Sequence, residues 1–416
     1  MRTLLFSIFM VFVHSLPAQM PEPKNILFFL YNGVEILDFS GPMEVLAAAG
    51  YKVYTVADKD TIVSRGILKV LPDYNFKKTS DYPKPDIVVV FGGSAHMQWG
   101  NESHQQFLRN VTANSVLDFS VCDGAFYFGG IGLLDGKTST TYHWLVSELQ
   151  KRFPKTTVLP GVRYVDNGDL ITTAGVSAGI DGAFYLVSKL KGEAYADFVA
   201  KRIEYEHWKP GSGKIVESDI LLKIKQEGFV AIAKGGQEIP LHRGEIANLG
   251  RWFMAEKRFV EASACFEFLI KKYQANHLDY SDLAAAMKEQ GKPAPPTKEA
   301  FLSLIDEQGG KAAQAVFEQT KKQYPDWQFL DPDALLFVGY YKYQNVGKFD
   351  EALAIFELNY AMFPDYHYSL AYQAEVYVLK KDKANALRLF RQVQKLMPEE
   401  NYFKARIKEI EKEEFK

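Results

Sequence analysis

The feature that most constrains the fold is a 34-residue repeat in the second half of the chain. Tyrosine, alanine, phenylalanine and proline recur at this spacing, at Tyr343, Ala352, Phe356 and Pro364 and again at Tyr377, Ala386, Phe390 and Pro398. A small residue lets two helices approach closely, an aromatic residue fills the gap between them, and a proline ends the second helix. The sequence therefore predicts stacked helix pairs in this half.

Weaker copies of the small residue, the aromatic residue and the proline occur earlier, at Ala262, Phe266, Ala313, Phe317 and Pro325. This period and these residue types are typical of tetratricopeptide repeats, whose concave surface binds a protein or peptide. A generic helical bundle is the alternative. We predict an all-α tetratricopeptide-repeat domain over residues 242–416 with a protein or peptide partner, unless the repeats pack onto the first domain without one.

The first half of the chain, from Asn25 to about Glu206, follows a different pattern. The apolar stretches "NILFFLY", "KVYTVA", "DIVVVFGG" and "SVLDFSV" are expected strands, and helices are expected between them, one of them capped by Ser40. "VRYVDNGDLITTAG" predicts a hairpin that turns at Asn167 and Gly168. Apolar strands that alternate with helices indicate a parallel α/β sheet covered on both faces, with ligands at the carboxyl ends of the strands.

The length of 416 residues exceeds what one hydrophobic core usually supports. We predict an α/β domain over residues 24–208 and a linker over 209–241, where "HWKPGSGKIVES" brings proline, glycine and serine close together. The repeat domain follows from residue 242.

The N-terminus, "MRTLLFSIFMVFVHSLPAQM", has an early arginine, an apolar run from Leu4 to Val13 and small residues by Ala18. The run is too short to cross a bilayer, so no membrane span is expected. It predicts a signal peptide over residues 1–18 and an exported protein, periplasmic or secreted. A buried strand or helix of the mature fold is the alternative.

Charge and histidine spacing limit the partners. The formal net charge is -2, which provides no basic surface for nucleic acid. The eight histidines show no metal-ligand spacing, so neither a metal nor a cofactor is expected. Gly92 and Gly93 are not followed by the lysine of a phosphate-binding loop.

Cys122 lies in "FSVCDGAFYF", where a strand pattern changes abruptly to a helix pattern. A nucleophile on such a sharp turn is called a nucleophile elbow, and the first N–H groups of the helix are expected to lower the pKa of the thiol. The alternative is a core cysteine. Cys265, among apolar residues at helical spacing, is expected to be a small core residue.

Four motifs in this half resemble the DJ-one/PfpI superfamily, whose members are related to class I glutamine amidotransferases. They are "GVEILDFSGPMEVL", "VVVFGG", "VCDGAFYFGGIGLLDGKTSTTYHW" and "RYVDNGDLITTAGVSAGIDGAFYLV". The match is best to the branch that contains isonitrile hydratases and the sensor halves of AraC-type regulators. The resemblance implies a flavodoxin-like sandwich, a homodimer and a small-molecule substrate or ligand.

The resemblance also implies roles for individual residues. Cys122 would be the nucleophile, and Asp38 would be the acid or base beside it, unless it only caps a helix. An oxyanion hole would combine the N–H of Asp123 with the turn formed by Gly92, Gly93 and Ser94.

Two departures from the family pattern concern the site and the attached domain. Asp123 stands where relatives have threonine or histidine, and a carboxylate beside the thiol opposes its ionisation unless it points away or is paired. His143 is a candidate general base or a structural residue. Repeats replace the DNA-binding half of the regulators.

Two functions therefore remain open. The first is a cysteine-dependent hydrolase, hydratase or deglycase-like enzyme that acts on a small carbonyl, amide or nitrile-like compound. The second is a non-catalytic domain that senses a small ligand or redox state, with the repeats as an adaptor.

Overall fold

The computed structural model describes residues 23–235, 239–273 and 275–412. The predicted signal peptide lies outside these residues. The chain divides into two compact units, Met1–Glu256 and Lys257–Lys416. Within the described ranges, no helix is long and apolar enough to cross a membrane.

The first unit is built on an eight-stranded sheet in the order β12-β10-β11-β7-β6-β1-β2-β5. Its strands are β1 (Asn25–Phe29), β2 (Lys52–Ala57), β5 (Tyr74–Asn75), β6 (Ile87–Val90), β7 (Leu117–Ser120), β10 (Tyr164–Asp166), β11 (Leu170–Thr173) and β12 (Lys214–Ile215). β10 and β11 form the antiparallel hairpin predicted around Asn167, and the other neighbouring pairs are parallel. The prediction of a mainly parallel α/β sheet is confirmed.

The central strands are apolar because both faces of the sheet are covered. Ile26 of β1 pairs with Val53 of β2 on one side and with Ile87 of β6 on the other. Every residue of β6 is buried. Two short strand pairs lie outside this sheet, β3 (Ile62–Ser64) with β4 (Leu68–Val70) and β8 (Thr138–Ser139) with β9 (Thr157–Val158).

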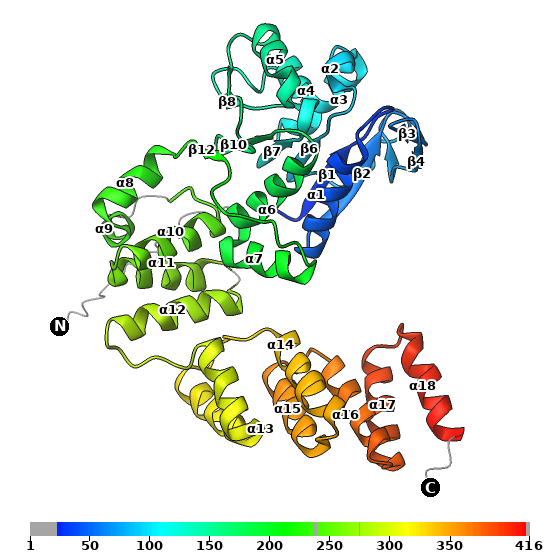
Figure 1. The fold of residues 1–416 in the computed structure, drawn as a ribbon, viewed down its shortest axis with the longest axis vertical. Helices are drawn as coiled ribbons and strands as arrows, with labels where there is room; N and C mark the ends of the chain where they lie inside the picture. The colour runs from blue at the N-terminus through cyan, green and yellow to red at the C-terminus, as the bar shows by residue number, and fades with distance from the viewer. Residues whose placement is uncertain (1–22, 236–238, 274, 413–416) are drawn as a thin grey trace, which may run out of the picture. The chain divides into compact units, whose positions relative to one another are not determined.

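Helices flank the sheet in two groups (Figure 1). One group contains α1 (Ile36–Ala48), α6 (Ser177–Lys191) and α7 (Glu193–Arg202), and the other contains α2 (Ala95–Gln98), α3 (Glu102–Thr112), α4 (Ala125–Gly130) and α5 (Val146–Arg152). The expected cap Ser40 lies inside α1, because the helix already begins at Ile36. Its hydroxyl donates to the carbonyl of Ile36 at 2.8 Å instead.

The boundary between the units differs from the predicted one at residue 242. The expected linker contains β12, α8 (Asp219–Glu227) and α9 (Phe229–Lys234), and α10 (Arg243–Ala255) belongs to the first unit. Gly244 lets α10 approach α6 so closely that a Cβ there would lie 2.3 Å from the carbonyl oxygen of Ser188. Buried Lys189 of α6 also pairs with Glu245 at 3.0 Å. Packing on α6 therefore holds α10 in the first unit.

The described residues of the second unit form helices connected by turns. These elements are α11 (Phe259–Lys272), α12 (His277–Glu289), α13 (Lys298–Gln323), α14 (Pro332–Phe337), the π-helical turn η3 (Val338–Tyr343), the 3-10 turn η4 (Gln344–Val346), α15 (Phe349–Met362), α16 (Tyr368–Leu379), α17 (Lys383–Leu396) and α18 (Asn401–Lys412). Successive helices pack against each other from α15 to α18.

The repeated positions have equivalent surroundings in this unit. Their alanines and phenylalanines are completely buried, at Ala352, Phe356, Ala386 and Phe390. The carbonyls of Tyr343 and Tyr377 accept equivalent turn hydrogen bonds at 2.9 Å, each from the residue five positions later. The helical region is therefore consistent with the predicted repeats. Cys265 is a buried core residue on α11, and both cysteines are free.

Candidate functional site

Cys122 lies on a strained turn between β7 and α4. It opens the 3-10 turn η1 (Cys122–Gly124) with a φ of 60°. Few residues other than glycine adopt this backbone region, and such strain is often found at functional sites. Its N–H donates to the carbonyl of Ala174 at 3.1 Å, and its own carbonyl accepts from the hydroxyl of Thr141 at 2.8 Å. The turn has the geometry of a nucleophile elbow.

Glycines allow other backbone segments to approach this turn closely. A Cβ on Gly124 would lie 2.7 Å from the carbonyl oxygen of Val90, and a Cβ on Gly92 would lie 2.6 Å from the Cβ of Cys122. Gly175 separates the sulfur from the ring of Tyr142. A Cβ placed on Gly175 would lie 3.4 Å from Sγ of Cys122 and 2.5 Å from the ring. Cys122 is consequently only 6% exposed.

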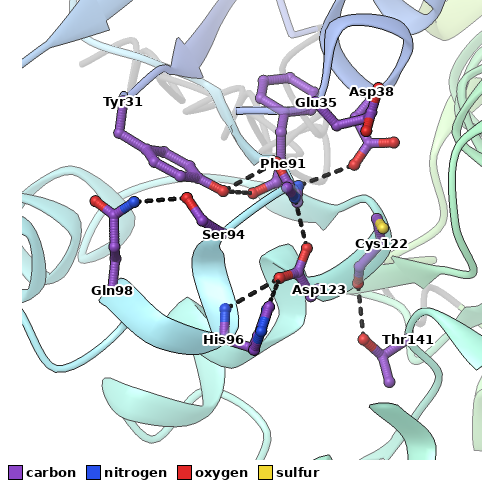
Figure 2. Close-up of polar contacts among 12 residues, drawn as sticks. Tyr31, Glu35, Asp38, Phe91, Ser94, His96, Gln98, Cys122, Asp123 and Thr141 are labelled. Carbon is purple, nitrogen blue, oxygen red and sulfur yellow. Dashed lines mark hydrogen bonds and ion pairs between the residues drawn. The ribbon is translucent and has the colours of Figure 1, made fainter. Parts of the chain in front are cut away.

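Asp38 lies beside the sulfur in the first turn of α1 (Figure 2). Its carboxylate is buried and accepts hydrogen bonds from the backbone N–H groups of Gly92, at 3.0 Å, and Val176, at 3.2 Å. Both donors come from outside the helix and the N-cap position is Glu35, so the alternative that Asp38 only caps α1 is wrong. Burial raises the pKa of Asp38 to about 7, although the bonds from Gly92 and from the thiol of Cys122 partly oppose this rise.

The pKa of the Cys122 thiol is raised, which contradicts the prediction from the helix N–H groups. Burial is the main cause, followed by the negative charges of Asp38 and Asp123. The N–H groups of Asp123 and Val176 do bond to the sulfur and favour the thiolate, but they are outweighed. At neutral pH the sulfur is therefore a thiol that donates a hydrogen bond to Asp38.

Asp123 is buried, and its carboxylate is turned away from the sulfur (Figure 2). One oxygen accepts the N–H of Gly93 at 2.6 Å, and the other accepts the N–H of His96 at 3.0 Å. The second oxygen also lies 2.5 Å from Nδ1 of the His96 ring. Asp123 is thus paired with His96, a histidine that follows the neighbouring strand β6.

This pairing changes the predicted oxyanion hole. The N–H groups of Gly92 and Gly93 already bind the carboxylates of Asp38 and Asp123. Ser94 accepts a hydrogen bond from Gln98 at 2.6 Å, and its hydroxyl is directed towards the carbonyl of Asn32 at 3.4 Å. The backbone donors directed at the sulfur are instead those of Asp123, as predicted, and Val176, which was not predicted.

A buried tyrosine forms hydrogen bonds to the backbone turn that carries Gly92. The hydroxyl of Tyr31 lies 2.8 Å from the carbonyl oxygen of Phe91 and 2.9 Å from that of Gly92. Burial raises the pKa of Tyr31 well above its ordinary value, so this hydroxyl keeps its proton. The position of the Gly92 N–H opposite Asp38 is therefore fixed on both sides.

His143 lies on the exposed turn η2 (His143–Leu145), where its ring contacts those of Tyr142 and Trp144. The ring centroids are 4.5 Å and 5.2 Å away. The ring of Tyr142, rather than that of His143, packs against Gly175 beside the sulfur. The structure therefore places His143 at the rim of the site, one residue removed from the side chain that borders the cysteine.

Sequence reasoning missed His96, Val176 and Tyr142 as site residues. His96 follows β6 and Asp123 follows β7, and these strands are neighbours in the sheet. Because parallel strands end at the same edge, this adjacency could have indicated the pair. Val176 has a φ of 52°, which its residue type does not suggest. Among the described residues, no cluster of three or more candidate metal ligands occurs.

The fold and the site together define a mainly parallel α/β domain with a buried cysteine on a nucleophile elbow. The model of the DJ-1/PfpI family matches residues 24–189. The isonitrile hydratase of Pseudomonas putida is 34% identical over 185 residues, which cover 44% of this chain and 78% of that enzyme. The chain therefore belongs to the DJ-1/PfpI family.

More distant similarity involves a regulator and a solved structure. The transcriptional regulator CdhR of Pseudomonas aeruginosa, of the helix-turn-helix type, is 24% identical over 186 residues, which cover 43% of this chain and 54% of the regulator. The crystal structure of Drosophila melanogaster DJ-1beta is 23% identical with a TM-score of 0.40, and the match covers 44% of this chain and 99% of that one.

Proposed function

We propose that the first unit is a cysteine-dependent enzyme that adds water to a small electrophilic carbon compound, with an isonitrile as the first substrate class to test. The observation that carries this proposal is the contact between the thiol of Cys122 and the buried carboxyl of Asp38. A carboxyl whose pKa is about 7 can accept and return a proton near neutral pH. The similarity to an isonitrile hydratase supports the choice of substrate.

The high pKa of the thiol requires its proton to leave as the sulfur attacks. In this scheme Cys122 forms a bond to the terminal isonitrile carbon, while its proton passes to Asp38 and then to the same carbon. The product is a thioimidate, in which sulfur is bonded to CH=N–R. Water then adds to this carbon, and expulsion of the sulfur with return of its proton gives the N-formyl amine. The N–H groups of Asp123 and Val176 stabilise the charge on the departing sulfur.

His96 is the candidate for activating the water. Asp123 holds its Nδ1, so the other ring nitrogen is left for a proton from water. His96 makes no further side-chain hydrogen bond within the described part of the chain, and its side chain is 32% exposed. A carboxylate that orients a histidine in this way is the usual arrangement for a general base.

Hydration of cyclohexyl isocyanide by the purified full chain tests the proposal. N-cyclohexylformamide should form with the wild-type protein and with Cys265→Ala, but not with Cys122→Ala. Equal rates with Cys122→Ala and the wild type, or no turnover of isocyanide, nitrile and amide probes, would contradict it.

The role of His96 has a separate readout. With His96→Gln, we expect the thioimidate to accumulate on Cys122 in the mass spectrum while its hydrolysis slows about 10²-fold or more. His207, an exposed histidine elsewhere in the first unit, provides the matched control His207→Gln. If His96→Gln slows formation of the adduct and its hydrolysis equally, water activation is not its role.

A non-catalytic sensor is the second candidate, and the burial of Cys122 favours it. Similarity to the regulator CdhR agrees with this alternative. A sensor that responds to oxidation should form a sulfinic acid on Cys122 under mild peroxide while Cys265 stays reduced. Equal oxidation of both cysteines, or of neither, would rule this form of sensing out.

We also propose that the protein is exported after cleavage near residue 18 and that it forms a homodimer. The apolar N-terminal run supports export, and the family resemblance supports the dimer. N-terminal sequencing of protein from the cell exterior or periplasm tests the first proposal. Light scattering on the purified chain tests the second, since a monomeric mass would refute it.

A further inference from the structure

The second unit has a long hollow with aromatic walls. Two adjoining hollows of about 580 Å³ and 350 Å³ share Tyr340, Tyr368 and Tyr372 as lining residues. We call this feature the tyrosine groove and define it by six of its side chains, Tyr340, Tyr341, Tyr366, Tyr368, Tyr372 and Tyr402. They come from η3, α16 and α18 and from the turn before α16, so the groove is lined by alternate helical elements of the chain.

Aromatic side chains are unusually exposed along this groove. Tyr341 is 63% exposed, Tyr368 is 40% exposed and Tyr402 is 56% exposed. Several rings contact one another, with centroids 5.0 Å apart for Tyr340 and Tyr341 and 5.8 Å apart for Tyr340 and Tyr372. A second contact joins Tyr366 and Tyr368 at 5.7 Å. A cluster of exposed aromatic residues is typical of a surface that binds another molecule.

Several polar groups of the groove have no partner in the described structure. The hydroxyls of Tyr340, Tyr341, Tyr368 and Tyr372 make no hydrogen bond to other described residues. The side-chain oxygen of Gln344, which also lines the groove, is buried without a hydrogen-bond partner. Hydroxyls both donate and accept hydrogen bonds and the amide oxygen accepts them, so these groups are able to bond to a polypeptide backbone.

The backbone of η3 provides a second, independent indication. Tyr340 and Tyr341 lie on this π-helical turn. Such turns are rare and occur frequently at functional sites, because they shift side chains out of the regular helical register. The irregular backbone therefore coincides with the aromatic lining.

The charge of the lining is negative. Three carboxylates, Asp333, Glu375 and Glu409, face the hollow together with one guanidinium, that of Arg406. Arg406 donates to both oxygens of Glu375 at 2.9 Å and to Glu409 at 3.1 Å. The single positive charge is thus already paired, and the lining keeps an excess of negative charge.

We propose that the tyrosine groove binds an extended segment of another protein that carries arginine or lysine side chains between apolar residues. The faces of tyrosine rings attract cations, and the excess carboxylate charge adds to this attraction. Apolar side chains of the segment cover the exposed ring surface, while its backbone bonds to the free hydroxyls and to Gln344. Acidic segments are repelled by the same charges.

Fluorescence anisotropy with the full chain tests this proposal. The probe is a short fluorescein-labelled peptide of alternating arginine, leucine and glycine, and the comparison peptide has glutamate in place of arginine. We expect the arginine peptide to bind at least about tenfold more tightly and to weaken as salt is raised to about 0.5 M.

Two matched pairs of variants locate the binding. Glu409→Gln removes charge in the groove, whereas Glu411→Gln removes a similar arginine-paired charge from the same helix outside the lining. Tyr368→Ala removes a ring of the groove, whereas Leu396→Ala removes an exposed apolar side chain of α17. The first member of each pair should weaken binding by about three- to tenfold and the second by less than about twofold. Thermal melts confirm that each variant is folded.

Three outcomes would overturn the proposal. They are equal affinity for both peptides, no binding of the arginine peptide, and equal effects within either pair of variants. A concentration-dependent dimer that Tyr368→Ala abolishes would also overturn it, because a second copy of the chain would then occupy the groove.

Discussion

The surroundings of Cys122 and the tyrosine groove use polar groups in opposite ways. Around Cys122 a few ionisable groups are buried together, so each one changes the protonation of the others. In the groove many aromatic rings are exposed to water, and the carboxylates are paired with Arg406 or with tyrosine hydroxyls at the surface. In a buried site, small changes of geometry cause large changes of pKa. An exposed surface instead binds other molecules through its contact area and its net charge.

The largest effect is expected in the buried core of the second unit. Phe356→Ala should destabilise this unit by about 3–5 kcal/mol, because it leaves a cavity beneath Gly339, which the ring contacts closely. Val346→Ala, at an exposed position of the same unit, should change stability by less than about 0.5 kcal/mol. Urea unfolding of the full chain, followed by circular dichroism, measures both. Similar values for the two variants would mean that the repeat positions are not a core.

The next effect concerns the thiol–carboxyl pair. Asp38→Asn should slow isocyanide hydration by about 10²-fold, since the carboxylate that accepts the thiol proton is lost. The wild-type rate should rise with pH through about 7, as Asp38 ionises, and this dependence should be absent from the variant. Rates between pH 5 and 9 check both statements, with Glu44→Gln, an acid on α1 that is not part of the site, as the control. An unchanged pH profile would remove Asp38 from the reaction.

The close backbone approach below the elbow can be tested without any substrate. Gly124→Ala should destabilise the first unit by about 1–3 kcal/mol, because the new methyl group would overlap the carbonyl of Val90. At Gly100 a Cβ would meet open space, so Gly100→Ala should be nearly neutral. Urea unfolding of both variants gives the difference. A stable Gly124→Ala protein would indicate that β6 and the turn are farther apart.

The last effect is the pH dependence of stability, which is small over any one pH unit. The pKa of Asp38 rises from its ordinary value of 3.8 to about 7 on folding, so the folded chain binds this proton more tightly than the unfolded chain. Stability should therefore fall as pH rises from about 4 to 7, by at most about 1.4 kcal/mol per pH unit for this group. Asp38→Asn should flatten the slope in chemical unfolding experiments. Asp118, also buried with a pKa of about 7, adds to the slope and provides Asp118→Asn for comparison. A slope that Asp38→Asn leaves unchanged would contradict the raised pKa.

Hydrophobic periodicity was sufficient to predict most of the architecture. The apolar runs became the central strands, and the recurring Ala and Phe positions became buried contacts between helices. The unit boundary was missed because α10 has the pattern of the helical half but packs on α6 through Gly244. Which unit a helix packs against depends on how well its surface fits that of its neighbour. The helical pattern of apolar residues does not specify this fit.

Only part of the candidate site followed from the sequence, and its hydrogen bonding did not. Cys122 and Asp38 were expected to meet, and they do. The N–H groups of Gly92 and Gly93 were expected to be open for a ligand, but they bind carboxylates. The N–H of Val176, a residue 138 positions from Asp38, also binds the Asp38 carboxylate and in addition bonds to the sulfur. Hydrogen bonds between residues so distant in the chain depend on the final packing of several loops.

The sequence by itself determined that a parallel sheet would carry a cysteine at the end of a strand and that a helical region would follow. These outcomes depend on local patterns of size and polarity, which act along each strand and helix. Only the tertiary structure decided which way Asp123 turns, that His96 is its partner, and that the pKa of Cys122 rises. The reason is that protonation depends on burial and on charges brought together across the fold.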